Sequence, residues 1–296
     1  MVTATAMGEA ITRRKSAATL RGRFLRSRRV VVAGSFLMLV VLVAVLAPVL
    51  SPASPIAIDL DHRLRPPFDP LGSKFLLGGD VLGRDILSRV IWGARISLLV
   101  GVTAVFVAGT IGVTLGLLAG FYGGRTDDII MRAADIQLAI PTLLLAIALI
   151  GVLGPSLRNL ILVLGMSGWV VYARIIRGVV LSLREAQFVE AARCIGANNL
   201  RIMVTHILRN VWTPAIVIAT QQVGGMIIAE SALSFLGMGV PPPTATWGGM
   251  IAEGRNYLST APHATTLPGL VLVATVLAVN FFGDGLRDVL DPRLRL

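Results

Sequence analysis

The stretch ISLLVGVTAVFVAGTIGVTLGLLAGFYGG, residues 96–124, contains no Asp, Glu, Lys or Arg. A helix needs roughly 20 apolar residues to cross about 30 Å of hydrocarbon. The stretch is long enough for that crossing, and it therefore predicts a membrane-spanning helix.

Three glycines recur within this stretch at every fourth residue. Gly112, Gly116 and Gly120 lie on one face of a helix, because residues four apart are neighbours on its surface. Glycines at this spacing let two helix backbones approach closely in lipid. The pattern predicts a helix-packing face, and the alternative is that glycine is simply common in membrane helices.

Five more stretches lack charged residues and are candidate spans. They cover residues 30–50, 136–157, 159–173, 211–229 and 264–283. The stretch 159–173 is short, and we expect it to continue past Arg174 and Arg177, whose long side chains can reach the membrane interface. The stretch 30–50 exceeds the roughly 7–15 apolar residues of a signal-peptide core, so it predicts a retained helix. The expected fold is an all-α polytopic membrane protein with about six transmembrane helices.

The composition agrees with this class. Hydrophobic residues make up 55% of the chain and charged residues only 15%, with a mean hydropathy of +0.79. Soluble proteins carry about 25% charged residues, because their surface faces water. The lipid bilayer is therefore an expected partner. A single cysteine, Cys194, excludes an intrachain disulfide.

The basic residues indicate the orientation of the chain. The net charge is +11, and eight basic residues lie between Arg13 and Arg29, directly before the first apolar stretch. This placement is typical of a cytoplasmic flank and does not indicate nucleic-acid binding. With the N-terminus inside, the inner segments hold 19 basic residues and the outer segments hold 8. Both termini are therefore expected in the cytoplasm.

This orientation divides the chain into five parts. They are a basic cytoplasmic tail (1–29), a first span (30–50), an extracytoplasmic loop (51–95), a transmembrane core (96–286) and a cytoplasmic C-terminal tail (287–296). The loop begins with many prolines, which predicts irregular structure. Its end, 80–95, mixes polar and apolar residues and predicts an amphipathic helix at the membrane surface.

The cytoplasmic segment 182–210 lies inside this core and is too long for a tight turn. One apolar stripe consists of residues at positions i, i+3, i+4 and i+7, namely Phe188, Ala191, Ala192 and Ile195. This spacing predicts a helix, with Glu190 beside the stripe.

The segment then changes direction. Gly196 predicts a stop, because glycine tolerates the left-handed conformation that closes a helix. Asn198 or Asn199 can cap a second helix running toward Leu208. A helix–glycine–helix elbow outside the membrane can dock into a groove of a partner protein, and the alternative is a plain connecting loop.

The motifs in this elbow resemble a known family. EAA at 190–192, Gly196 and HIL at 206–208 resemble the EAA coupling loop of ABC importer permeases. LGRD (82–85) with SR (88–89) and GAR (93–95), ESALSFLG (230–237), and GLRD (285–288) with DP (291–292) resemble the C-type permease of dipeptide and oligopeptide importers. The resemblance covers the chain from about residue 24 to its end. One departure is Arg209, where the family usually has proline.

The resemblance implies both a fold and a set of partners. The fold is that of a type I ABC importer permease, which forms half of a translocation pathway with a second, similar permease. Two ATP-hydrolysing subunits would dock at 182–210, and an extracytoplasmic binding protein would deliver the solute. Peptide is the implied cargo, and a nickel chelate or another small solute is the alternative.

ATP and Mg are expected in the partner subunits. A phosphate-binding loop needs Gly-Lys-Ser/Thr, and neither Lys15 nor Lys74 lies in such a motif. No nucleophile with a plausible base is recognisable, so we expect a non-catalytic subunit without a cofactor of its own. The histidines and Cys194 show no metal-ligand spacing.

Glu230 is an ionisable residue near the outer end of the fifth span. Such a residue is a functional candidate by default, either in the transport pathway or in structure. A secondary transporter would need paired ionisable residues deep in several spans, and the sequence offers few. That class and a non-transporting membrane scaffold are the alternatives to an importer permease.

Overall fold

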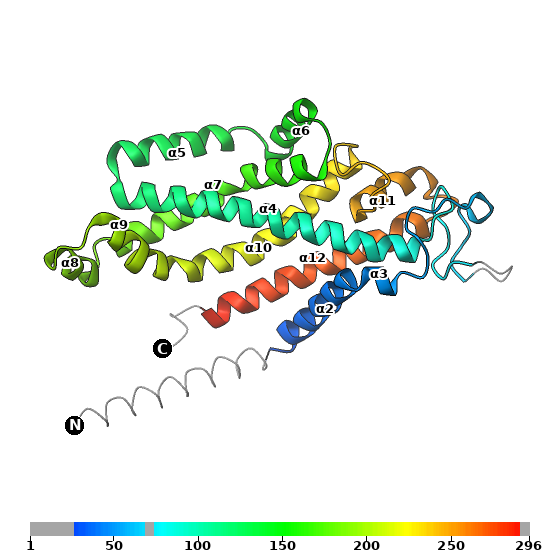
Figure 1. Ribbon diagram of the computed structural model, residues 1–296, viewed down its shortest axis with the longest axis horizontal. Helices are drawn as coiled ribbons and strands as arrows, with labels where there is room; N and C mark the ends of the chain where they lie inside the picture. Colours follow the sequence, from blue (N-terminus) through cyan, green and yellow to red (C-terminus); the bar gives the residue numbers. More distant parts are fainter. Residues whose placement is uncertain (1–26, 69–73, 291–296) are drawn as a thin grey trace, which may run out of the picture.

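The computed structural model describes residues 27–68 and 74–290 of the chain (Figure 1). Within these residues, five helices are long and apolar enough to cross a membrane, and a bent helix pair brings the number to six if it forms one span. The five helices are α2 (Arg28–Val45), α4 (Ile86–Tyr122), α7 (Leu157–Leu183), α10 (Leu208–Phe235) and α12 (His263–Leu290). The first 26 residues of the expected cytoplasmic tail, and residues 291–296, lie outside the described residues.

The segment between the first two spans is irregular, as its prolines predict. After the short helix α3 (Ala47–Leu50), its described residues contain one 3₁₀ turn, η1 (Leu60–His62), and fold back so that the amide of Leu64 bonds the carbonyl of Asp80. Gly83 has a φ of +74°, and a Cβ there would lie 1.7 Å from the carbonyl oxygen of Asp59. Only glycine fits this close approach.

The prediction of a separate surface helix within residues 80–95 is wrong. The helix α4 begins at Ile86 and continues through the membrane span without a break. Asp85 caps it, because its carboxylate accepts a hydrogen bond from the amide of Ser88 at 2.9 Å. Ile86, Ser88 and Arg89 are all buried. Burial on several sides explains the mixed polarity that resembles an amphipathic surface helix.

The expected third span, 136–157, is not one straight helix. Its first residues belong to α5 (Gly124–Leu138), and residues 142–153 form α6 (Thr142–Leu153), which meets α5 at an angle of 88°. Pro141 lies at the bend. Proline lacks an amide hydrogen and disfavours helical geometry in the residue before it, so it separates the two helices.

The helix α7 continues past two arginines, as predicted, and both have ion-pair partners on a neighbouring helix. Arg177 pairs with Asp127 of α5 through two hydrogen bonds of 2.5 Å, and Arg174 pairs with Asp135. These pairs fasten α5 along α7.

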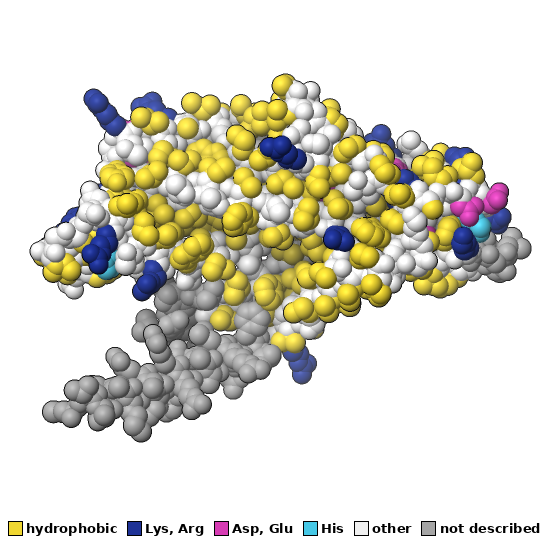
Figure 2. Space-filling view, viewed as in Figure 1, with side chains coloured by type: hydrophobic (Ala, Val, Ile, Leu, Met, Phe, Trp, Pro, Cys, Tyr) yellow, Lys and Arg dark blue, Asp and Glu magenta, His cyan; other side chains and the backbone are white. Residues whose placement is uncertain are grey.

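The long helices pack around a core of apolar side chains, with α4 in contact with α2, α7 and α10. Many large apolar side chains point outward instead, among them Phe106 and Val152, and Figure 2 shows such side chains over the long middle of one face. An outward apolar belt of this kind suits lipid.

The two non-membrane regions lie at opposite ends of the bundle (Figure 1). The segment expected outside the cell, of which residues 51–68 and 74–85 are described and which we call the outer segment, is at one end with α11 (Trp247–Gly254). The elbow around residues 187–201 is at the other end. The start of α2 lies beside the end of α12, because Val30 packs against Gly285. Both of these helix ends point toward the elbow end.

Candidate functional site

The elbow consists of a short helix closed by a glycine. The helix α8 spans Gln187–Cys194, and Gly196 follows with a φ of +79°. The amide of Ala197 bonds the carbonyl of Ala192 at 3.0 Å, and the amide of Gly196 bonds that of Arg193 at 2.9 Å. This pair of bonds is the Schellman motif, which satisfies the last carbonyls of a helix. The glycine thus has the geometry that the sequence predicts.

The second arm of the elbow begins at Asn198, whose side chain accepts a hydrogen bond from the amide of Arg201 at 2.8 Å. It does not end near Leu208. Instead α9 (Asn199–Arg201) passes through a π-helical stretch, η2 (Ile202–Ile207), directly into α10. Arg209 lies exposed in the first turn of α10, so the helix is unbroken where the family usually has proline.

One residue of the expected docking stripe, Ala192, faces the chain's own core and not the surface. Ala192 is only 4% exposed and, with the fully buried Val189, joins the same apolar cluster as Ile202 and Ile207. The inner face of α8 is therefore formed by residues 189 and 192. The periodicity selects four apolar positions on a helix but does not show which side meets the chain's own core.

The remaining stripe residues and their charged neighbour face outward. Phe188 is 41% exposed and Ile195 is 85% exposed, and Ala191 and Glu190 are exposed as well. The elbow at this end of the bundle thus exposes an apolar strip beside a carboxylate. The opposite side of its helix packs against the chain's own core.

The glycine face of α4 lies against α7. A Cβ at Gly112 would come within 2.4 Å of the carbonyl oxygen of Trp169, and one at Gly120 within 2.7 Å of Val180. At Gly116 the nearest atom, the carbonyl oxygen of Ala173, would be 2.7 Å away. These distances leave no room for a side chain, so the backbones of α4 and α7 are in close contact along this face.

Glu230 is completely buried near the end of α10. Its carboxylate accepts hydrogen bonds from the hydroxyls of Ser234 at 2.7 Å, and of Ser231 and Ser97 at 3.3 Å each. The hydroxyl of Ser97 also accepts from the amide of Trp247 at 3.4 Å. Glu230 therefore connects α10 with α4 and, through Ser97, with α11. A buried polar group needs such partners to offset its desolvation.

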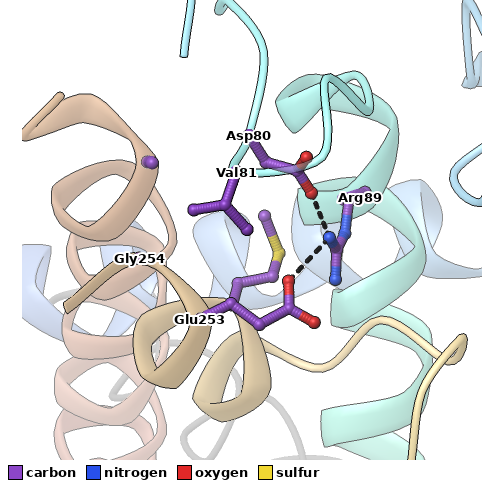
Figure 3. A pocket seen from close by; sticks show the side chains of 7 residues that line it. Asp80, Val81, Arg89, Glu253 and Gly254 are labelled. Carbon is purple, nitrogen blue, oxygen red and sulfur yellow. Dashed lines mark hydrogen bonds and ion pairs between the residues drawn. The ribbon is translucent and has the colours of Figure 1, made fainter. Parts of the chain in front are cut away.

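A second charged cluster, which sequence reasoning missed, lies at the end of the bundle opposite the elbow and is largely buried. We call Asp80, Arg84, Arg89 and Glu253 the outer ion cluster, and Figure 3 shows three of its members, Asp80, Arg89 and Glu253. Arg84 bonds Asp80 at 2.6 Å and Glu253 at 2.5 Å, while Arg89 bonds Glu253 at 2.8 Å and also pairs with Asp80. The two arginines balance the two carboxylates, and the cluster joins the outer segment, α4 and α11.

Nothing in the sequence pattern could have paired these residues, because Arg84 and Glu253 are 169 positions apart. The only signal was the resemblance of 82–85 and 88–89 to a family motif. In the described part of the chain, no three His, Cys, Asp or Glu side chains gather closely enough to hold a metal ion.

Comparison with known proteins places this bundle in a family. Residues 112–296 match the family described as the binding-protein-dependent transport system inner membrane component, and residues 18–67 match the N-terminal TM domain of oligopeptide transport permease C. The chain is 44% identical over 262 residues to the di/tripeptide transport system permease protein of Pseudomonas aeruginosa, a match that covers 88% of this chain and 86% of that protein.

Another relative is the glutathione transport system permease protein of Pectobacterium atrosepticum, 42% identical over 274 residues, covering 92% of this chain and 90% of the relative. Among solved structures, an inward-facing form of the MetNI methionine ABC transporter is similar with a TM-score of 0.56 and 18% identity. That match covers 69% of this chain and 97% of the transporter chain, and it shows the fold.

The expected all-α membrane fold and the resemblance in the motifs are both confirmed. The helices, their order and the solved neighbour identify the fold as that of a type I ABC importer permease. The chain belongs to the family of inner membrane components of binding-protein-dependent transport systems.

Proposed function

We propose that this chain is one permease subunit of a peptide importer and forms half of its translocation pathway with a second, similar permease. The family supports the general role, and the names of two relatives, which concern di/tripeptides and glutathione, support peptide cargo. Two ATP-binding subunits and an extracytoplasmic binding protein complete the proposed complex.

The outward face of the elbow is the observation that carries this proposal. Phe188, Ala191 and Ile195 form an apolar strip on a helix that projects from the bundle. Apolar strips on short helices are a common means of docking into a partner groove. Val189 and Ala192 anchor the opposite side of the helix, so a push on the strip is transmitted to the start of α10.

The partner that fits this strip is the ATP-binding subunit, which in this proposal binds ATP and Mg. The chain itself then acts without a cofactor and without catalysis. Glu190, exposed beside the strip, would orient the helix through polar contacts. Gly196 sets the angle of the elbow, because its φ of +79° is strained for any other residue.

The orientation in the inner membrane follows from this docking. The elbow must be cytoplasmic, and the start of α2 and the end of α12 lie at its end of the bundle (Figure 1). Both termini are then cytoplasmic, in agreement with the excess of basic residues in the inner segments. The outer segment and α11 would face the binding protein.

Gly112, Gly116 and Gly120 and the Glu230 cluster take structural roles in the proposal. The glycines hold α4 against α7, and Glu230 holds the outer ends of α4, α10 and α11 together.

Reconstitution tests the proposal. The chain, its partner permease and the ATP-binding subunits are co-purified and placed in vesicles. We expect peptide-loaded binding protein to stimulate ATP hydrolysis and drive peptide accumulation. Accumulation of nickel chelate but no peptide would contradict the proposed cargo. Peptide uptake that needs an ion gradient and no ATP would instead indicate a secondary transporter.

A further inference from the structure

A groove opens at the outer end of the bundle, between the end of α10 and α11. Its volume is about 420 Å³, within the range of roughly 300–1,000 Å³ that is usual for small-molecule sites. The end of α10 contributes Phe235 and Leu236 to its lining, and the segment of α11 and the residue after it contributes Ala252, Glu253 and Arg255.

Arg255 is the exposed cation of this groove, and two contacts orient its side chain. Its guanidinium lies over the ring of Phe235 at 4.9 Å, and its Nη1 donates to the carbonyl oxygen of Phe235 at 3.2 Å. The other guanidinium N–H groups have no partner within the described residues. A guanidinium held in this way presents donors in the planar arrangement that suits a carboxylate.

Glu253 contributes a carboxylate to the lining of the same groove. One of its oxygens accepts from Arg84 and from Arg89, the second of which is drawn in Figure 3. The other oxygen has no partner in the part of the chain that the structure describes. Glu253 and Arg255 are two residues apart, and side chains at that spacing on a helix do not face each other. Among the described residues, Glu253 and Arg255 therefore do not form an ion pair with each other.

The charge balance of the groove favours an anionic group. Within the outer ion cluster, the two arginines are matched by the carboxylates of Asp80 and Glu253. Arg255 is not part of that cluster, so it adds an uncompensated positive charge to the groove. A ligand carboxylate would bind at Arg255 and be kept away from Glu253.

We propose that this groove is a peptide subsite of the permease, in which Arg255 binds the C-terminal carboxylate and Phe235 and Leu236 contact the adjoining side chain. The free oxygen of Glu253 then orients the amino end of the peptide. This inference rests on the proposed function, because it assumes that peptides pass this chain.

Protection of a single cysteine tests the subsite directly. Cys194, the only cysteine of the chain, lies in the elbow at the opposite end and is replaced by serine. Leu236→Cys then introduces a thiol into the groove, where residue 236 is half exposed. The reconstituted complex is labelled from outside with a membrane-impermeant maleimide, without binding protein. The probe is a dipeptide with free ends at millimolar concentration.

We expect the free dipeptide to slow labelling of Leu236→Cys. Protection equals one plus the ratio of peptide concentration to Kd, so a concentration of about four times Kd gives about fivefold protection. The same dipeptide with an amidated C-terminus should give none, and Arg255→Gln should abolish the protection. Leu76→Cys, similarly exposed in the outer segment but outside the groove, is the matched control and should label at a constant rate.

Any one of three results would contradict the proposed subsite. The first is that a dipeptide that the complex imports does not slow labelling of Leu236→Cys. The second is equal protection by the amidated dipeptide, and the third is protection that persists in Arg255→Gln. Failure of the unsubstituted complex to import the dipeptide would contradict the proposed function instead, so the two failures are distinguishable.

Discussion

Replacing Gly112 by alanine should force α4 away from α7. The new Cβ would lie 2.4 Å from the carbonyl oxygen of Trp169 and 2.5 Å from the Cβ of Tyr172, where ordinary contacts measure 3.4–4 Å. The two helices must therefore separate locally by about 1 Å. Rotation of a side chain cannot relieve the clash, because one of the atoms belongs to the backbone.

The size of the effect follows from a matched comparison. Overpacking by a methyl group typically costs about 1–3 kcal/mol. Alanine also favours a helix over glycine by up to about 1 kcal/mol. Gly178→Ala adds the same methyl group to α7, where no atom lies within 4 Å of the new Cβ. The difference between the two variants removes the propensity contribution, and we expect Gly112→Ala to be less stable by about 1–3 kcal/mol.

The assay is reversible unfolding of the purified chain in mixed micelles with increasing dodecyl sulfate. The free energy of unfolding is compared between Gly112→Ala, Gly178→Ala and the unsubstituted chain. Equal values for the two variants would refute the reasoning, because the glycine face would then not set the distance between α4 and α7.

Two further predictions concern the buried carboxylate and the topology. Glu230→Gln keeps the shape of the side chain and one acceptor oxygen, and its NH2 group can donate to a serine hydroxyl, so it should transport nearly normally. Glu230→Ala leaves three serine hydroxyls without their acceptor and should lower the yield of complex; a well-assembled but inactive Gln variant would show that the charge itself is needed. A reporter fused within residues 182–210 or after Leu296 should indicate the cytoplasm and one within 55–75 the outer compartment, and a cytoplasmic signal from 55–75 would exclude the proposed orientation.

Local signals in the sequence predict some features of the site well. Gly196 and Asn198 mark the end and the start of helices through their own backbone preferences, which need no knowledge of the rest of the fold. The spacing of Gly112, Gly116 and Gly120 places them on one face of any helix. In each case the physical cause lies within a few residues of the position.

Features that depend on the surroundings are harder to predict. A search for uncharged stretches does not detect the 88° bend between α5 and α6, although Pro141 is a local signal for a helix break. Ala192 has the right period for a docking stripe, but only the position of Ile202 and Ile207 decides that it faces inward. The outer ion cluster depends on contacts between distant segments, and no periodic pattern in the sequence indicates it.

Position 191 offers the most direct test of coupling through the elbow. Ala191 is exposed, so Ala191→Arg should leave the fold of this chain intact, with a change in stability within about 0.5 kcal/mol. It nevertheless places a bulky charge on the apolar strip that would dock against the ATP-binding subunit.

The measurement is ATP hydrolysis by reconstituted complexes in response to peptide-loaded binding protein, with the amount of the chain in the membrane determined in parallel. We expect Ala191→Arg to be inserted at the normal level but to lose the ATP-binding subunit, and with it the stimulated hydrolysis. Normal assembly and full stimulation in this variant would contradict coupling through the elbow.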